Sequence, residues 1–394
     1  FDFRQVVESY VASDNLATTG SSYKSSITNI IPNHPIHLID KYSKNTNAMR
    51  WLRIEFKTVY TVSGSVIIDT PISSVNYRLF NGYLKYDDVL DLQNINFGYD
   101  LSQFKLDSDT KSFLTNAPTT QFANLEDYGT VSFLDSSNDL SSIILKYYNS
   151  SGVQIGTENV SQNVINGGGF SATQDIQRNM FYFGCFPANL RSYGTTVGTP
   201  TLFQSLVTAG TIQGGHYTFQ AFKTVSTNFV TQEYRINLNC PNLKGYESIR
   251  LCWLNQWGAW DYYTFTQKST RNISTKGSTY EQLAGTWNDS SYRANGFKGG
   301  KKTFRVNATE KIKMNTDFVS ENENVMFEEL TNSPEVYILA KYSNVFDVTT
   351  VLNQYVTPVR ITSTNFTKKT VANDKLIQYT FEVEKSKTLR TQSI

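Results

Sequence analysis

Aromatic side chains that can bind a sugar gather in one short string, Ile249–Phe265, which reads IRLCWLNQWGAWDYYTF. Alternation places Ile249, Leu251 and Trp253 on one face of a strand, and Gly258 permits the chain reversal of a hairpin. Flat aromatic faces stack on pyranose rings, and the candidates for carbohydrate binding are Trp257, Trp260, Tyr262 and Tyr263. The same rings can instead fill a sandwich core or a domain or subunit junction, so the string predicts a hairpin and leaves its use open.

Motifs for catalysis and metal binding are sparse. His34 and His37 could reach one metal ion together with Asp40, but a third spaced ligand on a regular element is missing. We therefore expect an ordered loop there, and a structural hydrogen bond at His216. The chain has no nucleophile elbow, phosphate loop, dinucleotide fingerprint or zinc-protease motif. We expect no catalytic residue, no cofactor and no metal ion.

A glycoside hydrolase is the one enzyme class that a motif search leaves open, because its two carboxylates are paired in space and not along the chain. Such a pair should lie roughly 5 to 9.5 Å apart across a cleft. The carboxylates to consider, which we expect at turns and strand ends, are Asp87, Asp88, Asp91 and Asp261.

Composition favours strands. The 394 residues include 25 Phe, 24 Tyr and 5 Trp, too many aromatics for an intrinsically disordered chain. Ser, Thr and Asn dominate the polar positions, and short alternating segments bounded by turn residues recur along the chain. We predict an all-β protein of two or three antiparallel β-sandwich or barrel domains. We expect no membrane insertion, because no run of about 18 apolar residues is present.

Composition also suggests three domains. We expect an N-terminal β-rich domain at 1–120 and an immunoglobulin-like β-sandwich at 121–265, interrupted by a long exposed loop at about 163–215. The polar stretch QKSTRNISTKGSTYEQLAG then marks the boundary of a C-terminal β-rich domain at 266–394. Ser320 and Glu323 fit a capping box that starts one short helix, near 321–330.

Charge separates the last third from the rest. Residues 1–265 contain 18 basic and 21 acidic residues, whereas residues 266–394 contain 18 and 13. Arginine is scarce in this basic part, and no aromatic residues interleave with its lysines along the chain. We therefore expect a solvated surface or an acidic protein partner, and no specific nucleic acid.

Four segments in order carry a family resemblance: LCWLNQWGAWDYYTF, MFEELTNSPEVYIL, TPVRITSTNFTKKT and DKLIQYTFEVEKS. Together they resemble virion structural proteins of tailed bacteriophages. In particular they are similar to tail-tip or baseplate components of phages from marine and Bacteroidetes-type bacteria. The resemblance covers about residues 180–394.

The resemblance implies a non-enzymatic structural component of a phage virion, in the tail tip, the baseplate or a tail adaptor. Such a protein assembles as a symmetric homo-oligomer with other tail proteins and can anchor fibres. The alternative is a carbohydrate-binding β-sandwich protein that binds a host-surface glycan. A capsid decoration or collar protein and a glycoside hydrolase are further alternatives.

Overall fold

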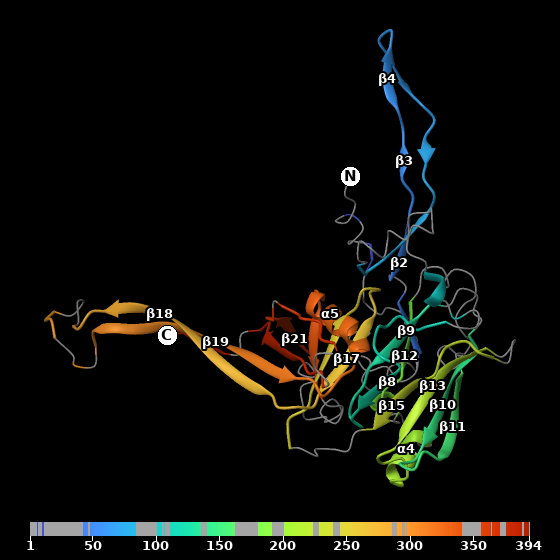
Figure 1. Ribbon diagram of the computed structural model, residues 1–394. Helices are drawn as coiled ribbons and strands as arrows, with labels where there is room; N and C mark the ends of the chain where they lie inside the picture. The colour runs from blue at the N-terminus through green and yellow to red at the C-terminus, as the bar shows by residue number, and fades with distance from the viewer. Residues whose placement is uncertain are drawn as a thin grey trace. The chain divides into compact units, whose positions relative to one another are not determined.

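The computed structural model describes residues 6, 10–11, 42–45, 48–83, 101–104, 106, 111–134, 140–161, 180–190, 201–223, 228–238, 245–285, 290–293, 296, 298–340, 356–363, 365–370, 376–387 and 390–393. Figure 1 shows the helices and strands, coloured from blue at the N-terminus to red at the C-terminus. The chain divides into two compact units. Unit 1 comprises Phe1–Pro241, Cys252–Tyr262 and Lys341–Leu352, and unit 2 comprises Asn242–Leu251, Tyr263–Ala340 and Asn353–Ile394. The boundaries expected at residues 120 and 265 stay predictions. The described residues form mostly strands in several antiparallel sheets, which confirms the all-β prediction.

Two sheets form the body of unit 1. Their strands are β1 (Tyr42–Asn45), β8 (Thr120–Ala123), β9 (Thr130–Phe133), β10 (Ser142–Tyr148), β11 (Gln154–Ser161), β12 (Met180–Gly184), β13 (His216–Lys223), β14 (Asn228–Phe229) and β15 (Tyr234–Leu238). One sheet has the order β11-β10-β13-β15-β8, with β14 beside β13, and the other has the order β1-β12-β9. Most neighbours are antiparallel, but β15 pairs with β8 in parallel.

A hairpin joins β10 to β11, as the Asn-Ser-Ser-Gly turn in the sequence predicts. The Asn149 side-chain Oδ1 accepts hydrogen bonds from the backbone N–H groups of Ser151 at 3.0 Å and Val153 at 2.9 Å. Gly152 has a φ of 77°, a conformation that glycine adopts without steric cost. Local side-chain chemistry therefore fixes this turn.

Aromatic rings join the two sheets of unit 1 into a sandwich-like core. The Phe113 ring lies 6.1 Å from Phe133 in β9 and 5.8 Å from Phe219 in β13, measured between ring centroids. Tyr234 of β15 stacks on Phe219 at 5.4 Å. All four side chains are buried, and burial of such large apolar area is the main stabilising term.

Part of the segment 163–215 differs from the exposed loop expected there. Every residue of β12 is buried, and the helix α3 (Pro187–Leu190) after it is also buried. A second helix, α4 (Leu202–Thr208), begins where the Thr201 Oγ1 accepts the backbone N–H of Gln204 at 3.1 Å. A continuous apolar run such as Met-Phe-Tyr-Phe is typical of a strand covered on both faces.

Unit 2 contains most of one large sheet, and the division between the two units falls within two strands of this sheet. Its strands are β16 (Ile249–Leu254), β17 (Trp260–Phe265), β18 (Thr270–Gln282), β19 (Gly300–Asn315), β20 (Val336–Leu339), β21 (Val356–Ile361), β22 (Thr380–Lys385) and β23 (Arg390–Ser393). They have the order β17-β16-β20-β21-β22-β19-β18, with β23 beside β19. The strand β18 occupies the polar stretch that we expected to separate two domains. Only five residues connect the neighbours β16 and β17, so they form the predicted hairpin, because a parallel pair needs a longer crossover.

The predicted helix is present in unit 2. A 3₁₀ turn, η3 (Glu321–Glu323), leads into α5 (Asn324–Asn332). The Glu323 carboxylate accepts the backbone N–H of Ser320 at 2.5 Å and its hydroxyl at 3.1 Å, which is the predicted capping interaction. The helix buries Phe327, whose ring lies 5.5 Å from Phe381 and 5.0 Å from Tyr263. Among the described residues, no helix has the length and apolar character that crossing a membrane requires.

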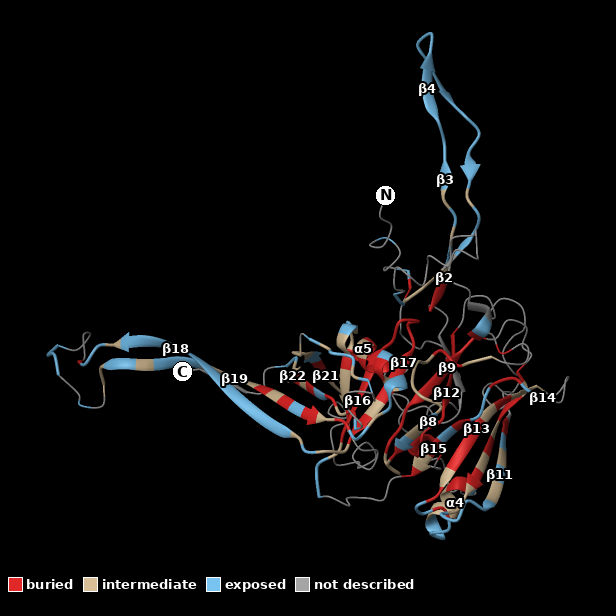
Figure 2. Cartoon of the chain, in the orientation of Figure 1, coloured by how far each residue is buried: buried red, intermediate tan, exposed pale blue. Residues whose placement is uncertain are grey.

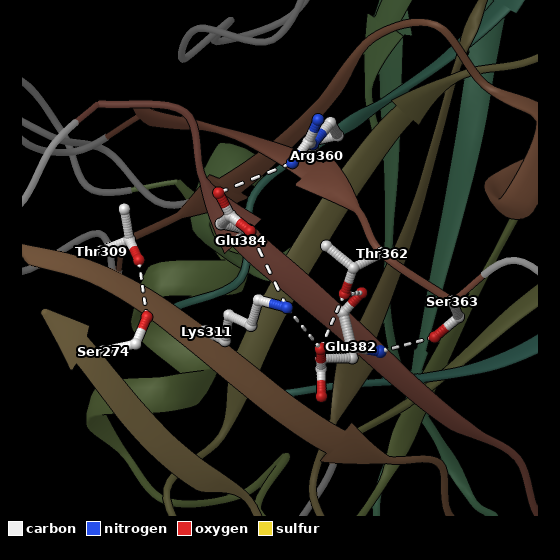
Figure 3. A network of polar contacts seen from close by, with 8 residues as sticks. All are labelled: Ser274, Thr309, Lys311, Arg360, Thr362, Ser363, Glu382 and Glu384. Carbon is white, nitrogen blue, oxygen red and sulfur yellow. Dashed lines mark hydrogen bonds and ion pairs between the residues drawn. The ribbon is translucent and has the colours of Figure 1, made fainter. Parts of the chain in front are cut away.

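Ion pairs lie on both faces of this sheet, between exposed side chains on one face and around a buried carboxylate on the other. On the outer face, the Lys311 Nζ lies 3.6 Å from Glu382 and 3.9 Å from Glu384 (Figure 3). On the opposite face, the buried Glu310 carboxylate lies 2.6 Å from the Lys385 Nζ and 2.7 Å from the Arg271 Nη1. Burial alone would raise the pKa of Glu310, but the hydrogen bonds and charges of Lys385 and Arg271 outweigh it and hold this pKa below its ordinary value.

We expect Glu310→Gln to lower the free energy of unfolding of unit 2 by about 3 kcal/mol, because it leaves two cations beside a neutral buried amide. The matched change Glu382→Gln, at a side chain that is 39% exposed, should cost less than about 1 kcal/mol. The difference should shrink as the pH falls through the lowered folded pKa of Glu310, where its carboxylate is protonated. Native-state hydrogen exchange in β19 and β22 measures both variants, and equal losses at neutral pH would contradict the expectation.

Candidate functional site: two exposed β-ribbons

The aromatic residues proposed from the sequence as a sugar platform do not form an exposed face. Trp257, Trp260 and Tyr262 are 3%, 1% and 4% exposed and belong to unit 1. Tyr263 belongs to unit 2, is half-buried, and packs on the α5 residue Phe327. A stacking platform needs open ring faces, so these rings act as core side chains in this structure.

Three polar side chains fix the turn of the aromatic hairpin, and we call Thr115, Asn255 and Asp261 the hairpin knot. The Thr115 hydroxyl donates to the Asp261 Oδ1 at 2.5 Å, and the Asn255 Nδ2 donates to the Oδ2 at 3.1 Å. The Asn255 Oδ1 accepts the backbone N–H groups of Trp257 at 3.1 Å and Ala259 at 3.0 Å. Burial raises the pKa of Asp261 to about 6, although the hydrogen bonds of the knot act in the opposite direction.

The hairpin turn lies directly against the segment Asn81–Gly82. Gly258 has a φ of 72°, and a Cβ added to it would overlap the carbonyl oxygen of Asn81. A Cβ added to Gly82 would likewise overlap the carbonyl oxygen of Gln256. Both glycines thus permit two backbones to approach closely. The hairpin therefore positions residues 81–82, which directly follow the last strand of the first ribbon in the sequence.

We call this first ribbon, Met49–Phe80, the apolar ribbon. It consists of three successive strand pairs: β2 (Met49–Leu52) with β7 (Tyr77–Phe80), β3 (Glu55–Phe56) with β6 (Ile72–Ser73), and β4 (Val59–Val62) with β5 (Ser65–Ile68). At its tip, Ser63 and Gly64 have φ values of 50° and 83°, as a two-residue type I′ turn requires. Every residue from 55 to 73 is exposed, and the ribbon is pale blue along this length in Figure 2.

The tip of the apolar ribbon carries bare apolar side chains on both faces. Val59, Val66 and Ile68 share one face through the pairs Val59↔Ile68 and Thr61↔Val66, and they are 60%, 66% and 62% exposed. Tyr60 and Ile67 pair on the other face and are also exposed. No charged residue occurs from 58 to 68. Among the described residues, no third strand pairs with β4 or β5.

We call the second ribbon the basic ribbon, and it is the outer part of β18 and β19, residues 276–282 and 300–305. All residues of β18 from 270 to 281 are exposed, whereas β19 becomes buried toward the sheet (Figure 2). The sequence suggested a basic surface here and a strand at Lys302–Val306, but it did not reveal that this strand pairs with β18.

The other candidate residues divide between structural roles and undescribed positions. His216 lies 3.3 Å from the Arg235 Nη2 and stacks on Tyr148 at 4.6 Å, in keeping with the structural role expected for it. Burial first, and then the charge of Arg235, lower the pKa of His216. The part of the chain that the structure describes holds no cluster of metal-ligating side chains. Outside it lie His34, His37, Asp40, Asp87, Asp88 and Asp91.

A search of protein-family models and of curated proteins finds no match for this chain. The functional argument therefore rests on the ribbons and on the hairpin that positions one of them.

We expect Gly258→Ala to lower the free energy of unfolding by about 3 kcal/mol, because it adds a clash with Asn81 to the strain of a positive φ. The matched change Gly64→Ala has an equally unfavourable φ of 83° but open space around the new Cβ, so it should cost about 1 kcal/mol. Urea unfolding followed by tryptophan fluorescence compares the two variants. Similar losses would show that the contact with Asn81 is unimportant.

The pKa of Asp261 is higher in the folded state than in the unfolded state. At a pH between these two pKa values, Asp261 therefore keeps its proton in the folded protein and loses it in the unfolded chain. The stability contributed by that proton is complete below pH 4 and is lost as the pH rises through about 6. We expect this group to lower the free energy of unfolding by about 3 kcal/mol between pH 4 and pH 7. Asp261→Asn removes this titration, so its urea midpoint should vary less with pH than that of the wild type, and parallel pH profiles would contradict the account.

Proposed function

We propose that this chain is a non-enzymatic structural component of a tailed-phage virion that assembles as a symmetric oligomer through its apolar ribbon. The observation that carries the proposal is the uncharged ribbon tip, which exposes apolar side chains on both faces. The resemblance of residues 180–394 to tail-tip and baseplate proteins supports a place in the tail, with other tail proteins as further partners. A collar or decoration position would use the same ribbon.

Physical reasoning favours a covered ribbon. A lone two-stranded hairpin is marginally stable in water, and it needs a third strand or a packed face to be stable. Its free edges and β-branched, uncharged tip are also a template for pairing with another chain. Exposed apolar area of this kind marks an interaction site in a soluble protein. A neighbouring copy that covers the ribbon supplies what the isolated chain lacks.

Carbohydrate binding has no comparable support, because the rings on which it depends are buried. Asp261, the described carboxylate considered for glycoside hydrolysis, is engaged by Thr115 and Asn255. Neither function is therefore proposed as a second candidate.

The proposal predicts that the native mass rises with protein concentration and approaches the mass of a closed oligomer. The double variant Val66→Lys with Ile68→Lys places two charges on one exposed face of the tip, so it should shift the mass to the monomer while the circular dichroism spectrum stays unchanged. Val153→Lys, at another exposed apolar residue, in the β10–β11 turn and 59% exposed, should leave assembly intact. A wild type that is monomeric at every concentration, or a double variant that assembles normally, would contradict self-assembly through this ribbon.

A further inference from the structure

The basic ribbon concentrates positive charge beyond the average of the chain. Residues 276–282 and 300–305 contain four basic residues and one acidic residue, a net charge of +3, whereas the whole chain has a net charge of +2. The net charge of the remaining residues is therefore −1, the difference between these two values.

Strand register sorts these charges between the two faces of the ribbon. The pairs Lys276↔Asn307, Ser278↔Arg305 and Tyr280↔Lys302 share one face, because alternate residues of β18 point to the same side. We call Lys276, Lys302 and Arg305 the cation row. No acidic residue takes a position on this face from 276 to 282 or from 300 to 307. The acidic Glu281 pairs with Lys301 on the other face.

The same face is balanced closer to the sheet. There Lys311 pairs in register with Glu384 and Lys313 with Glu382, and Arg360 lies 3.6 Å from Glu384 (Figure 3). Carboxylates are thus supplied to this face where β22 borders β19.

We propose that the basic ribbon binds nucleic acid, with the cation row contacting phosphates. The three cations lie at successive same-face positions, about 6.8 Å apart along the ribbon, which suits a regular row of charges better than an irregular acidic protein surface. Exposed rings accompany them: Tyr280 pairs with Lys302, and its ring centroid lies 6.5 Å from that of Phe304. Aromatic faces beside cations can stack on bases, and a two-stranded ribbon fits the major groove of duplex DNA.

This inference goes beyond the proposed assembly role and rests on a different ribbon. It also departs from the expectation of no nucleic-acid partner. That expectation overlooked Phe304, which lies between Lys302 and Arg305 in the sequence, and it could not foresee that Tyr280 pairs with Lys302 across two strands. The bulge between Ser278 and Thr279 sets this alignment, and no local sequence pattern reveals it.

Fluorescence anisotropy of the full chain with a labelled 20-base-pair duplex and a 20-nucleotide single strand, from 50 to 200 mM KCl, tests the proposal. The test variant carries Lys276→Gln, Lys302→Gln and Arg305→Gln. The control carries Lys301→Gln, Lys311→Gln and Lys313→Gln, which removes the same charge from other positions. Circular dichroism checks that both variants fold.

For the wild type we expect the logarithm of the duplex association constant to fall with the logarithm of salt concentration with a slope of about −2.7 or steeper, from three phosphate contacts. The test variant should bind at least about tenfold more weakly at 100 mM KCl with a flatter slope, and the control should stay within about threefold. Tighter duplex binding would indicate the groove, and tighter single-strand binding would indicate stacking on Tyr280 and Phe304. No binding at 50 mM KCl, equal losses in both variants, or equally effective competition by polyglutamate, which would indicate an acidic protein partner, would each overturn the proposal.

Discussion

A buried carboxyl group that must be satisfied inside the core fixes the turn on which the apolar ribbon depends. Asp261 meets this constraint through Thr115 and Asn255, and Asn255 in turn holds the backbone of the turn with its other oxygen. The turn can then approach Asn81–Gly82 at a distance that only glycine allows. Solvent competes poorly for these bonds because the group is buried. A solvent-exposed ribbon is thus attached to a turn that two closely approaching backbones hold in place.

Local signals in the sequence predicted local structure correctly. The all-β class, the hairpin after Ser142–Tyr148, the aromatic hairpin and the capped helix α5 all follow from turn chemistry, alternation and capping residues within a few positions of one another. Whether a segment is buried could not be predicted from such local signals. The runs around Ser63-Gly64 are as apolar as core strands, yet within the described part of the chain they pair only with each other, and they stay exposed. Met180–Gly184 fell within an expected loop but is a buried strand, and the strands that pair with it, β1 and β9, come from distant parts of the chain.

The candidate sites show the same division between local and distant information. Sequence identified Trp257, Trp260, Tyr262 and Tyr263 as a distinctive group, but their patterns did not reveal that the first three face a core. Asp261 attracted attention only as one of many carboxylates, because its partner Thr115 is 146 residues away. The Ser-Gly pair between two β-branched runs was the available signal for the apolar ribbon. The cation row had no such signal, because a bulge and the pairing of two strands create it.

Two exposed ribbons of opposite character carry the two proposed interactions, one uncharged and apolar and the other basic. The central claim is that another copy covers the apolar ribbon. Hydrogen exchange of the backbone amides of residues 59–68, measured at low and at high protein concentration, tests that claim most directly. Covered strands lose access to water, so the account predicts that exchange in this segment slows markedly at high concentration. Fast exchange there at every concentration, while the protein is shown to be oligomeric, would contradict it.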